Sequence, residues 1–105
     1  MTKRAELLEF DAPPDQALAA CRSAVARLGW EISEAKEDRL VTHQDPTKLS
    51  CREWPVEVVI EVLAGGEDRG CVSLDASVPG RGPISSRNLR SGLAALERAI
   101  HRSLA

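Results

Sequence analysis

The order of hydrophobic patterns along the chain constrains its fold more than any other feature. An alternating strand over residues 5–11 precedes a helix over residues 14–28, four further strand-like runs and an amphipathic helix that reaches residue 104. With 105 residues, the chain has enough material for one hydrophobic core. Because amphipathic helices pack on the apolar face of an antiparallel sheet, we predict a single α+β domain over residues 1–105. It is expected to be a two-layer sandwich of order β-α-β-β-β-β-α, with both helices on one face.

The first helix has clear signals at both ends. Pro14 suits the first helical position, where a missing N–H costs nothing, and Gly29 suits the left-handed residue that closes a helix. Between them, apolar side chains recur at three- and four-residue steps: Leu18, Cys21, Val25 and Leu28. The pattern predicts a helix over Pro14–Leu28 with one buried face.

Two hairpins are predicted after this helix. The first opens with Trp30 and Ile32 as inward residues and returns over residues 40–43 through a charged turn. The second pairs residues 56–62 with residues 72–78, and both strands alternate apolar with polar side chains. The sheet is therefore expected to have one apolar face and one wet, acidic face. A polar loop over residues 44–53 joins the two hairpins.

The last helix is predicted from residue 87 onward. Its apolar stripe consists of Leu89, Leu93, Leu96, Ile100 and Leu104. Ser85 or Ser86 is expected to cap its N-terminus, because a hydroxyl can accept a bond from a free backbone N–H there. Gly92 lowers helix propensity and is expected to mark a close approach to the sheet.

Composition argues against several classes of protein. The net charge of −2 offers no field for a phosphate backbone, so no nucleic-acid partner is predicted. No apolar run approaches the roughly 20 residues of a membrane span, and no signal-peptide pattern opens the chain, so we expect a cytoplasmic protein without a membrane partner. Three widely spaced cysteines, Cys21, Cys51 and Cys71, favour free thiols over a disulfide framework or a metal site. No cofactor is predicted.

The order of elements resembles the TATA-binding-protein-like fold and the helix-grip family, in which a long C-terminal helix lies across a curved antiparallel sheet. The segment of residues 78–84, leading into residues 87–90, also resembles the end of small bacterial domains of unknown function. Proteins with such folds bind DNA, lipids, small hydrophobic ligands or other proteins. The resemblance therefore implies a fold and leaves the function open.

Five residues are candidate ligand-binding residues. Four surround the start of the last helix, where hydroxyls and guanidiniums suit an anionic group: Arg81, Ser85, Ser86 and Arg87. The alternative for them is a turn with a serine cap and solvated arginines. The fifth, Trp54, is expected either to pack in the core or to line a groove under the last helix.

The function we predict from these features is non-enzymatic binding. His43 and Cys51 flank the polar loop, but no third residue is identified to orient them, so no catalytic residue is predicted. The favoured partner is another protein or a second copy of the chain, which a contiguous outer patch of Leu7, Val41 and Val59 would support. The alternative is a carrier of a small hydrophobic ligand or lipid in a pocket between the last helix and the sheet. That pocket would be lined by Trp30, Ile60, Leu74 and Leu93, beneath the stripe of the last helix.

Overall fold

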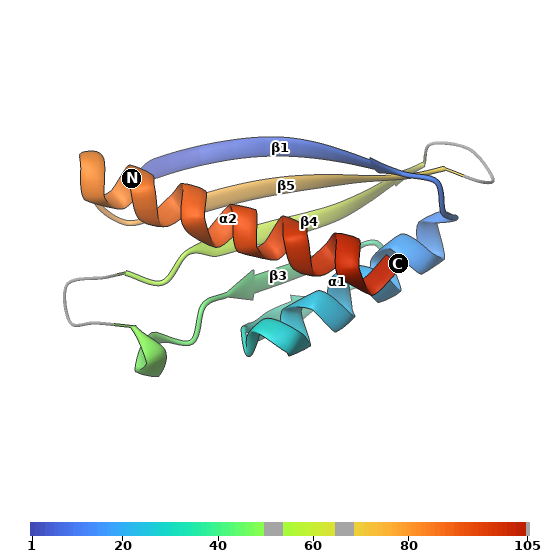
Figure 1. Cartoon of the computed structure of the whole chain (residues 1–105), viewed down its shortest axis with the longest axis horizontal. Coiled ribbons are helices and arrows are strands. Elements are labelled where there is room, and N and C mark those ends of the chain that lie inside the picture. Colours follow the sequence, from blue (N-terminus) through green and yellow to red (C-terminus); the bar gives the residue numbers. More distant parts are fainter. Residues whose placement is uncertain (50–53, 65–68, 105) are drawn as a thin grey trace.

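The computed structural model describes residues 1–49, 54–64 and 69–104. It contains one antiparallel sheet of order β1-β5-β4-β3-β2, with both helices on the same face (Figure 1). Its elements are β1 (Thr2–Phe10), α1 (Pro14–Leu28), β2 (Glu31–Ala35), β3 (Arg39–His43), the short 3-10 helix η1 (Pro46–Lys48), β4 (Glu57–Ala64), β5 (Gly70–Val78) and α2 (Pro83–Leu104). The predicted α+β fold class, element order and placement of the helices are confirmed.

The connection through α1 carries the chain from one edge of the sheet to the other. β1 lies at one edge and pairs with β5 from Thr2↔Val78 to Phe10↔Gly70. After α1 the chain re-enters at the opposite edge as β2, and the β2–β3 and β4–β5 hairpins then fill the sheet inward. Both predicted hairpins are confirmed. At the first, Lys36 N–H donates to Arg39 O at 2.7 Å.

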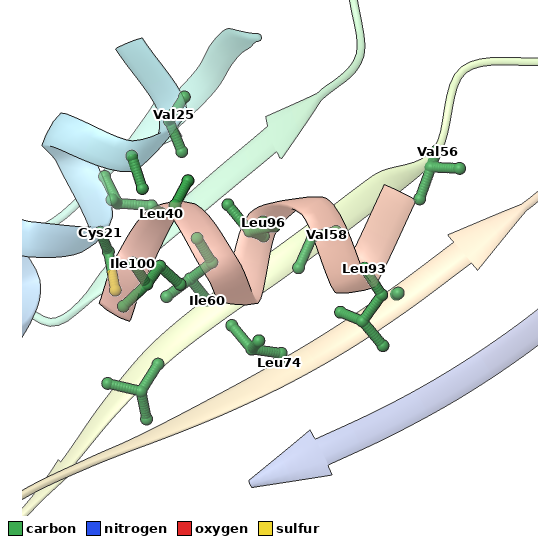
Figure 2. Packing of buried hydrophobic residues seen from close by; sticks show 14 of the residues in the cluster. Cys21, Val25, Leu40, Val56, Val58, Ile60, Leu74, Leu93, Leu96 and Ile100 are labelled. Carbon is green, nitrogen blue, oxygen red and sulfur yellow. The ribbon is translucent and has the colours of Figure 1, made fainter. Parts of the chain in front are cut away.

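The core lies between the helices and the sheet, and the predicted alternation of β4 and β5 is confirmed. Figure 2 shows side chains from α1, α2 and the inner strands meeting in this layer. The inward residues of the second hairpin are fully buried: Val58, Ile60, Val72, Leu74, Ala76 and Val78. On the outer face, Glu57 and Asp75 are exposed. Burying each large aliphatic side chain contributes about 1.5–3 kcal/mol.

The bounds predicted for α1 are confirmed, because local signals fix both ends. Pro14 stands at the start of the helix, and Gly29 adopts a left-handed conformation with φ of 71°. The N–H groups of Gly29 and Trp30 donate to the carbonyls of Ala26 and Val25, which satisfies the last turn.

The predicted start of α2 is wrong by four residues. The helix begins at Pro83, and the Ser86 N–H donates to Gly82 O at 3.1 Å. Ser85 and Ser86 therefore lie within the first turn and are not the N-cap. The reason is that Pro83, read as part of a loop, has a ring whose fixed φ suits a first helical position.

Two further expectations concern β2 and Gly92. Ile32 pairs with Thr42, which is fully buried and pairs in turn with the inward residue Val58, so the predicted inward position of Ile32 is confirmed. Its side chain is nevertheless 45% exposed, because β2 is an edge strand. A Cβ added to Gly92 would lie 3.3 Å from Gln44 Nε2 and 3.4 Å from Val56 Cγ2. The predicted close approach is therefore confirmed, and it is made to the segment that leads into β4.

Candidate functional site

The layer beneath the middle of α2 is filled by side chains. The residues expected to line a pocket there are Trp30, Ile60, Leu74 and Leu93. Ile60, Leu74 and Leu93 are each at most 1% exposed and line none of the cavities described here (Figure 2). Trp30 is half-buried and lines a small cavity of about 170 Å³ beside α2, together with Gln44, Asn88, Ser91, Gly92 and Ala95. The predicted pocket is therefore packed core at three of its four residues, and only Trp30 borders a hollow.

The largest cavity described here, about 510 Å³, lies where α1 begins and β4 ends. We call it the α1–β4 cleft; its lining consists of Pro14, Asp15, Leu18, Glu37, Asp38, Val62 and Leu63. Two features bring these segments together. Val62 N–H donates to Asp38 O at 2.8 Å, which holds the β2–β3 turn against β4. Leu18 belongs to the apolar stripe of α1 and packs against the edge of the core.

The lining of the α1–β4 cleft combines apolar contact area with negative charge. Leu18 and Val62 are half-buried, whereas Leu63 is 41% exposed. The carboxylates of Asp15, Glu37 and Asp38 are on exposed residues around them. Such a cleft can hold an apolar body and interact with a cationic or hydrogen-bond-donating group at its rim.

A second cleft, of about 340 Å³, lies at the opposite end of the sheet, between β1 and the first turns of α2. We call it the β1–α2 cleft; its lining consists of Thr2, Lys3, Arg4, Ser86, Leu89 and Arg90. Thr2 Oγ1 donates to Gly80 O at 3.0 Å, which ties β1 to the loop before the helix. Arg4 Nε lies 3.0 Å from Glu6 Oε1.

The structure places only part of the predicted anion site in this cleft. Ser86 lines it, whereas Arg81 and Arg87 are exposed and outside its lining. Ser85 turns toward the preceding loop, since a Cβ added to Gly80 would lie 2.9 Å from Ser85 Oγ. Trp54 is 60% exposed, so its predicted core packing is wrong.

Sequence reasoning does not find the basic residues of the β1–α2 cleft. Lys3 and Arg4 are adjacent near the start of the chain, and Arg90 lies within the last helix. The pairing of Thr2 with Val78 brings β1 beside the start of α2. The basic residues themselves are visible in the sequence, but no local pattern shows that β1 and α2 are neighbours.

A carboxyl pair lies beside the β1–α2 cleft, where α2 crosses β1. Glu97 Oε1 is buried and has no hydrogen-bond partner among the described residues. Burial, and then hydrogen bonding to and repulsion from Glu6, raise the pKa of Glu97 to about 7. Hydrogen bonds from Glu97 and Arg4 lower the pKa of Glu6. The pair therefore shares one proton in mildly acidic solution.

The predicted neighbours His43 and Cys51 are not described as a pair, because Cys51 lies outside the described residues. His43 Nδ1 lies 3.1 Å from Gln44 O, and because a carbonyl only accepts, this nitrogen carries the proton. The other nitrogen, Nε2, faces Glu31 Oε2 at 3.6 Å. Cys21 is fully buried, and burial raises the pKa of its thiol to about 12, so it is no nucleophile.

Metal binding and membrane insertion find no support in the described residues. Within residues 1–49, 54–64 and 69–104, no three His, Cys, Asp or Glu side chains lie close enough to hold a metal ion. In the same part of the chain, neither helix has the length and apolarity needed to cross a bilayer.

The outer face of the sheet does not present one apolar patch. Val41 and Val59 are paired across β3 and β4. Leu7 is 58% exposed on β1, but β5 separates it from them and contributes Ser73 and Asp75 to this face. The contiguous patch expected for a protein interface is therefore interrupted by polar groups.

Comparison with known proteins identifies the fold. No family model matches the sequence, and no curated protein is significantly similar to it. The chain is similar in structure to DynU16 of the dynemicin biosynthetic locus (17% identity, TM-score 0.68), covering 97% of this chain and 46% of DynU16. CalU16 from Micromonospora echinospora (14% identity, TM-score 0.65) is similar over 92% of this chain and 71% of its own length. A START superfamily protein from Mycobacterium smegmatis (12% identity, TM-score 0.62) is similar over 93% of each chain.

These structures show that the fold is helix-grip-like, which is one of the two folds that the element order resembles. The other, the TATA-binding-protein-like fold, is not confirmed. At such low identities the likeness shows the fold alone, and the chain spans about half the length of DynU16. Activities therefore do not pass from these proteins to this one.

The prediction of a non-enzymatic protein is corrected by the same comparison. The di-domain ARO/CYC BexL of the BE-7585A biosynthetic pathway shares the fold (16% identity, TM-score 0.52), over 96% of this chain and 47% of its own. A fold that is found in biosynthetic proteins of the aromatase/cyclase type does not argue against catalysis. The absence of a sequence motif was the sole reason for that prediction, and it is not sufficient.

Proposed function

We propose that this chain binds a small, largely apolar ligand in the α1–β4 cleft. The observation that carries the proposal is the cleft itself, whose volume of about 510 Å³ and apolar side chains occur in a helix-grip-like fold. Ligand sites commonly have about 300–1,000 Å³ and a mostly apolar lining with a few polar groups. The core beneath the middle of α2 is filled, and this cleft is larger than the cavity of about 170 Å³ beside Trp30.

The carboxylates around the cleft favour a ligand that carries a positive or hydrogen-bond-donating group. Asp15, Glu37 and Asp38 are on its rim, while Leu18 and Val62 offer contact area. A ligand that places its apolar part on these two side chains and an amine near the carboxylates would satisfy both features. A neutral apolar ligand would leave the carboxylates in water at little cost.

This proposal takes the place of the predicted protein-interaction module. The outer face offers no continuous apolar patch, because Ser73 and Asp75 separate Leu7 from Val59. We retain as proposals that residues 1–105 act as one domain and that the protein works in the cytoplasm. The candidate residues Arg81, Ser85, Arg87 and Trp54 have no part in the proposed α1–β4 site.

Native mass spectrometry of the protein purified gently from its own host tests the proposal. A bound small molecule should add mass to the chain of 11.4 kDa. The variant Leu18→Glu should lose that added mass, because it places a charge on an apolar contact of the cleft. Leu7→Glu is the matched control: it makes the same change at an exposed leucine on the outer face and should retain the ligand.

Circular dichroism at the same temperature must show that both variants are folded. If no ligand is found on the native protein, or if Leu18→Glu retains it as fully as Leu7→Glu does, the α1–β4 cleft is not the site.

A further inference from the structure

We propose that β1 is a pairing edge for a second copy of this chain, which adds its own β1 antiparallel to the sheet. A second copy is one of the partners predicted from the sequence, placed here at an edge of the sheet instead of on its outer face. The proposal does not depend on the function proposed above, because no residue of β1 lines the α1–β4 cleft. It is carried by an open backbone, a long regular strand and a charge pattern that complements itself.

β1 has one neighbouring strand and one open side. It stands at the end of the sheet order beside β5, and Figure 1 shows it along the border of the sheet. Lys3, Ala5 and Leu7 are exposed on this strand. The open side of an edge strand carries N–H and C=O groups that can pair with the backbone of another strand.

The pairing of the sheet shows which backbone groups of β1 face the open side. Val62 N–H donates to Asp38 O, so the even-numbered residues of β4 bond to β3. Because successive residues of an antiparallel strand bond to opposite sides, the odd-numbered residues of β4 bond to β5. The even-numbered residues of β5 then bond to the even-numbered residues of β1. The backbone groups of Lys3, Ala5 and Leu7 are therefore left for another strand.

The two edges of the sheet differ in their protection against such pairing. β2, at the opposite edge, has five residues and an irregular register between Ile32 and Glu34. Short length and a bulge both hinder the addition of a strand. β1 has nine residues in unbroken register with β5 and contains no proline. β1 is therefore the edge that is able to receive a second copy.

The charges of β1 complement each other in a register centred on Ala5. When Ala5 lies opposite Ala5 of the second copy, Arg4 lies opposite Glu6 of that copy and Glu6 lies opposite its Arg4, which is a favourable cross-strand pair on each side of the centre. Arg4 already donates to Glu6 of its own chain, and its guanidinium has further N–H groups for the second copy. In the same register, Lys3 lies opposite Leu7, and the open backbone groups form about six hydrogen bonds.

Full overlap of the two strands is the competing register. It would bring Lys3 opposite Glu9 on the outer side, but it would also place Glu6 opposite Glu6. Glu6 already shares a hydrogen bond with Glu97, so four carboxyl groups would meet at the centre of the pair. Like charges directly opposite each other destabilise a strand pair. The register centred on Ala5 is therefore favoured.

Sedimentation equilibrium over a range of protein concentrations tests the pairing. The native protein should approach twice the chain mass of 11.4 kDa as the concentration rises. Ala5→Pro should associate at least about tenfold more weakly, because proline lacks the N–H at the centre of the pair, while the β1–β5 ladder does not use that group. Ala5→Val is the matched control, which keeps the N–H and should associate as the native protein does. Circular dichroism must show that both variants are folded.

Two charge reversals test the register. Arg4→Glu places a carboxylate opposite Glu6, and Glu6→Arg places a guanidinium opposite Arg4, so each variant alone should associate about tenfold more weakly than the native protein. An equimolar mixture of the two variants should regain the association, because every opposed pair then has opposite charges.

Three results would overturn the proposal. The first is a native protein that stays monomeric at about 1 mM, where even weak pairs associate. The second is Ala5→Pro that associates as tightly as Ala5→Val. The third is a mixture of the two charge reversals that associates no better than either variant alone.

Discussion

The two ends of the sheet differ in the chemistry that they offer. Where β1 begins, the β1–α2 cleft has two arginines and a lysine in its lining. Where β4 ends, the α1–β4 cleft has three carboxylates around four apolar side chains. Between the two ends, the layer under α2 is closed by packed side chains (Figures 1 and 2). The comparison teaches that the centre of this fold supplies stability, while its ends are free to carry binding groups.

This division has a physical reason. A residue in the centre contacts both a helix and the sheet, so a change of volume there disturbs packing on both sides. Residues at the ends contact one neighbouring element and water, so they can be charged at little cost. Binding chemistry at the ends is therefore compatible with a stable centre.

The largest effect is expected from the centre, with Leu74→Ala. Leu74 is fully buried on β5, and truncation of such a leucine costs about 2–5 kcal/mol through lost contacts and a cavity. Leu63→Ala, at a position that is 41% exposed in the α1–β4 cleft, should cost less than about 1 kcal/mol. Urea unfolding measures the free energy of unfolding of both variants. Equal losses of unfolding free energy would show that the centre and the end do not differ in packing.

A smaller loss is expected for Gly70→Ala, at the end where α1 meets the sheet. An added Cβ would lie 2.9 Å from Ala17 Cβ and 3.0 Å from the backbone oxygen of Ala12, so something must move. We expect a loss of about 1–3 kcal/mol in unfolding free energy.

Gly92→Ala is the matched comparison within α2. Its nearest contacts are looser, at 3.3 Å and 3.4 Å, and alanine gains about 1 kcal/mol of helix propensity. A net change within about 1 kcal/mol is therefore expected. If Gly70→Ala proves as neutral as Gly92→Ala, the approach of α1 to β5 is less tight than the structure shows.

A pH-dependent effect of a few degrees is expected at the β1 end, from the carboxyl pair. The pKa of Glu97 is raised to about 7 in the folded protein, so the folded state holds this proton more tightly than the unfolded state does. Stability should therefore fall as the pH rises from about 5 to above 7. The lowered pKa of Glu6 has the opposite sign, and its contribution is lost only in more acidic solution.

Thermal melts at pH 6 and pH 8 measure this effect. Glu97→Gln should remove the decrease between these two values, because an amide cannot ionise. A variant that keeps the full decrease would assign it to other groups.

The sequence allowed the centre to be predicted well and the ends poorly. Pro14 and Gly29 set the bounds of α1 through local backbone preferences, and the alternation of β5 placed Leu74 in the core. Local signals failed at α2, because Pro83 suits both a loop and a first helical turn. At Ile32 the alternation gave the correct face of the sheet but not the exposure, because nothing local shows that β2 is an edge strand.

The clefts depend on pairings between distant segments. The β1–α2 cleft exists because β1 pairs with β5, the last strand along the chain, which brings Arg4 near Arg90. The alternation of a strand says which residues share a face, but not which strand lies next to it. The same limit applies to Leu18 and Val62, which line one cleft although they are far apart in the sequence.

The smallest effect on stability is expected for Arg4→Gln at the β1 end. Arg4 and Glu6 form an ion pair at 3.0 Å with side chains 49% and 30% exposed, and such pairs contribute about 0.2–1 kcal/mol. Arg22→Gln is the matched control, because Arg22 is an exposed arginine of α1 with no carboxylate oxygen within 4.0 Å among the described residues. It should leave the free energy of unfolding unchanged. Urea unfolding measures both variants, and equal losses of stability would show that the Arg4–Glu6 pair contributes nothing beyond an exposed charge.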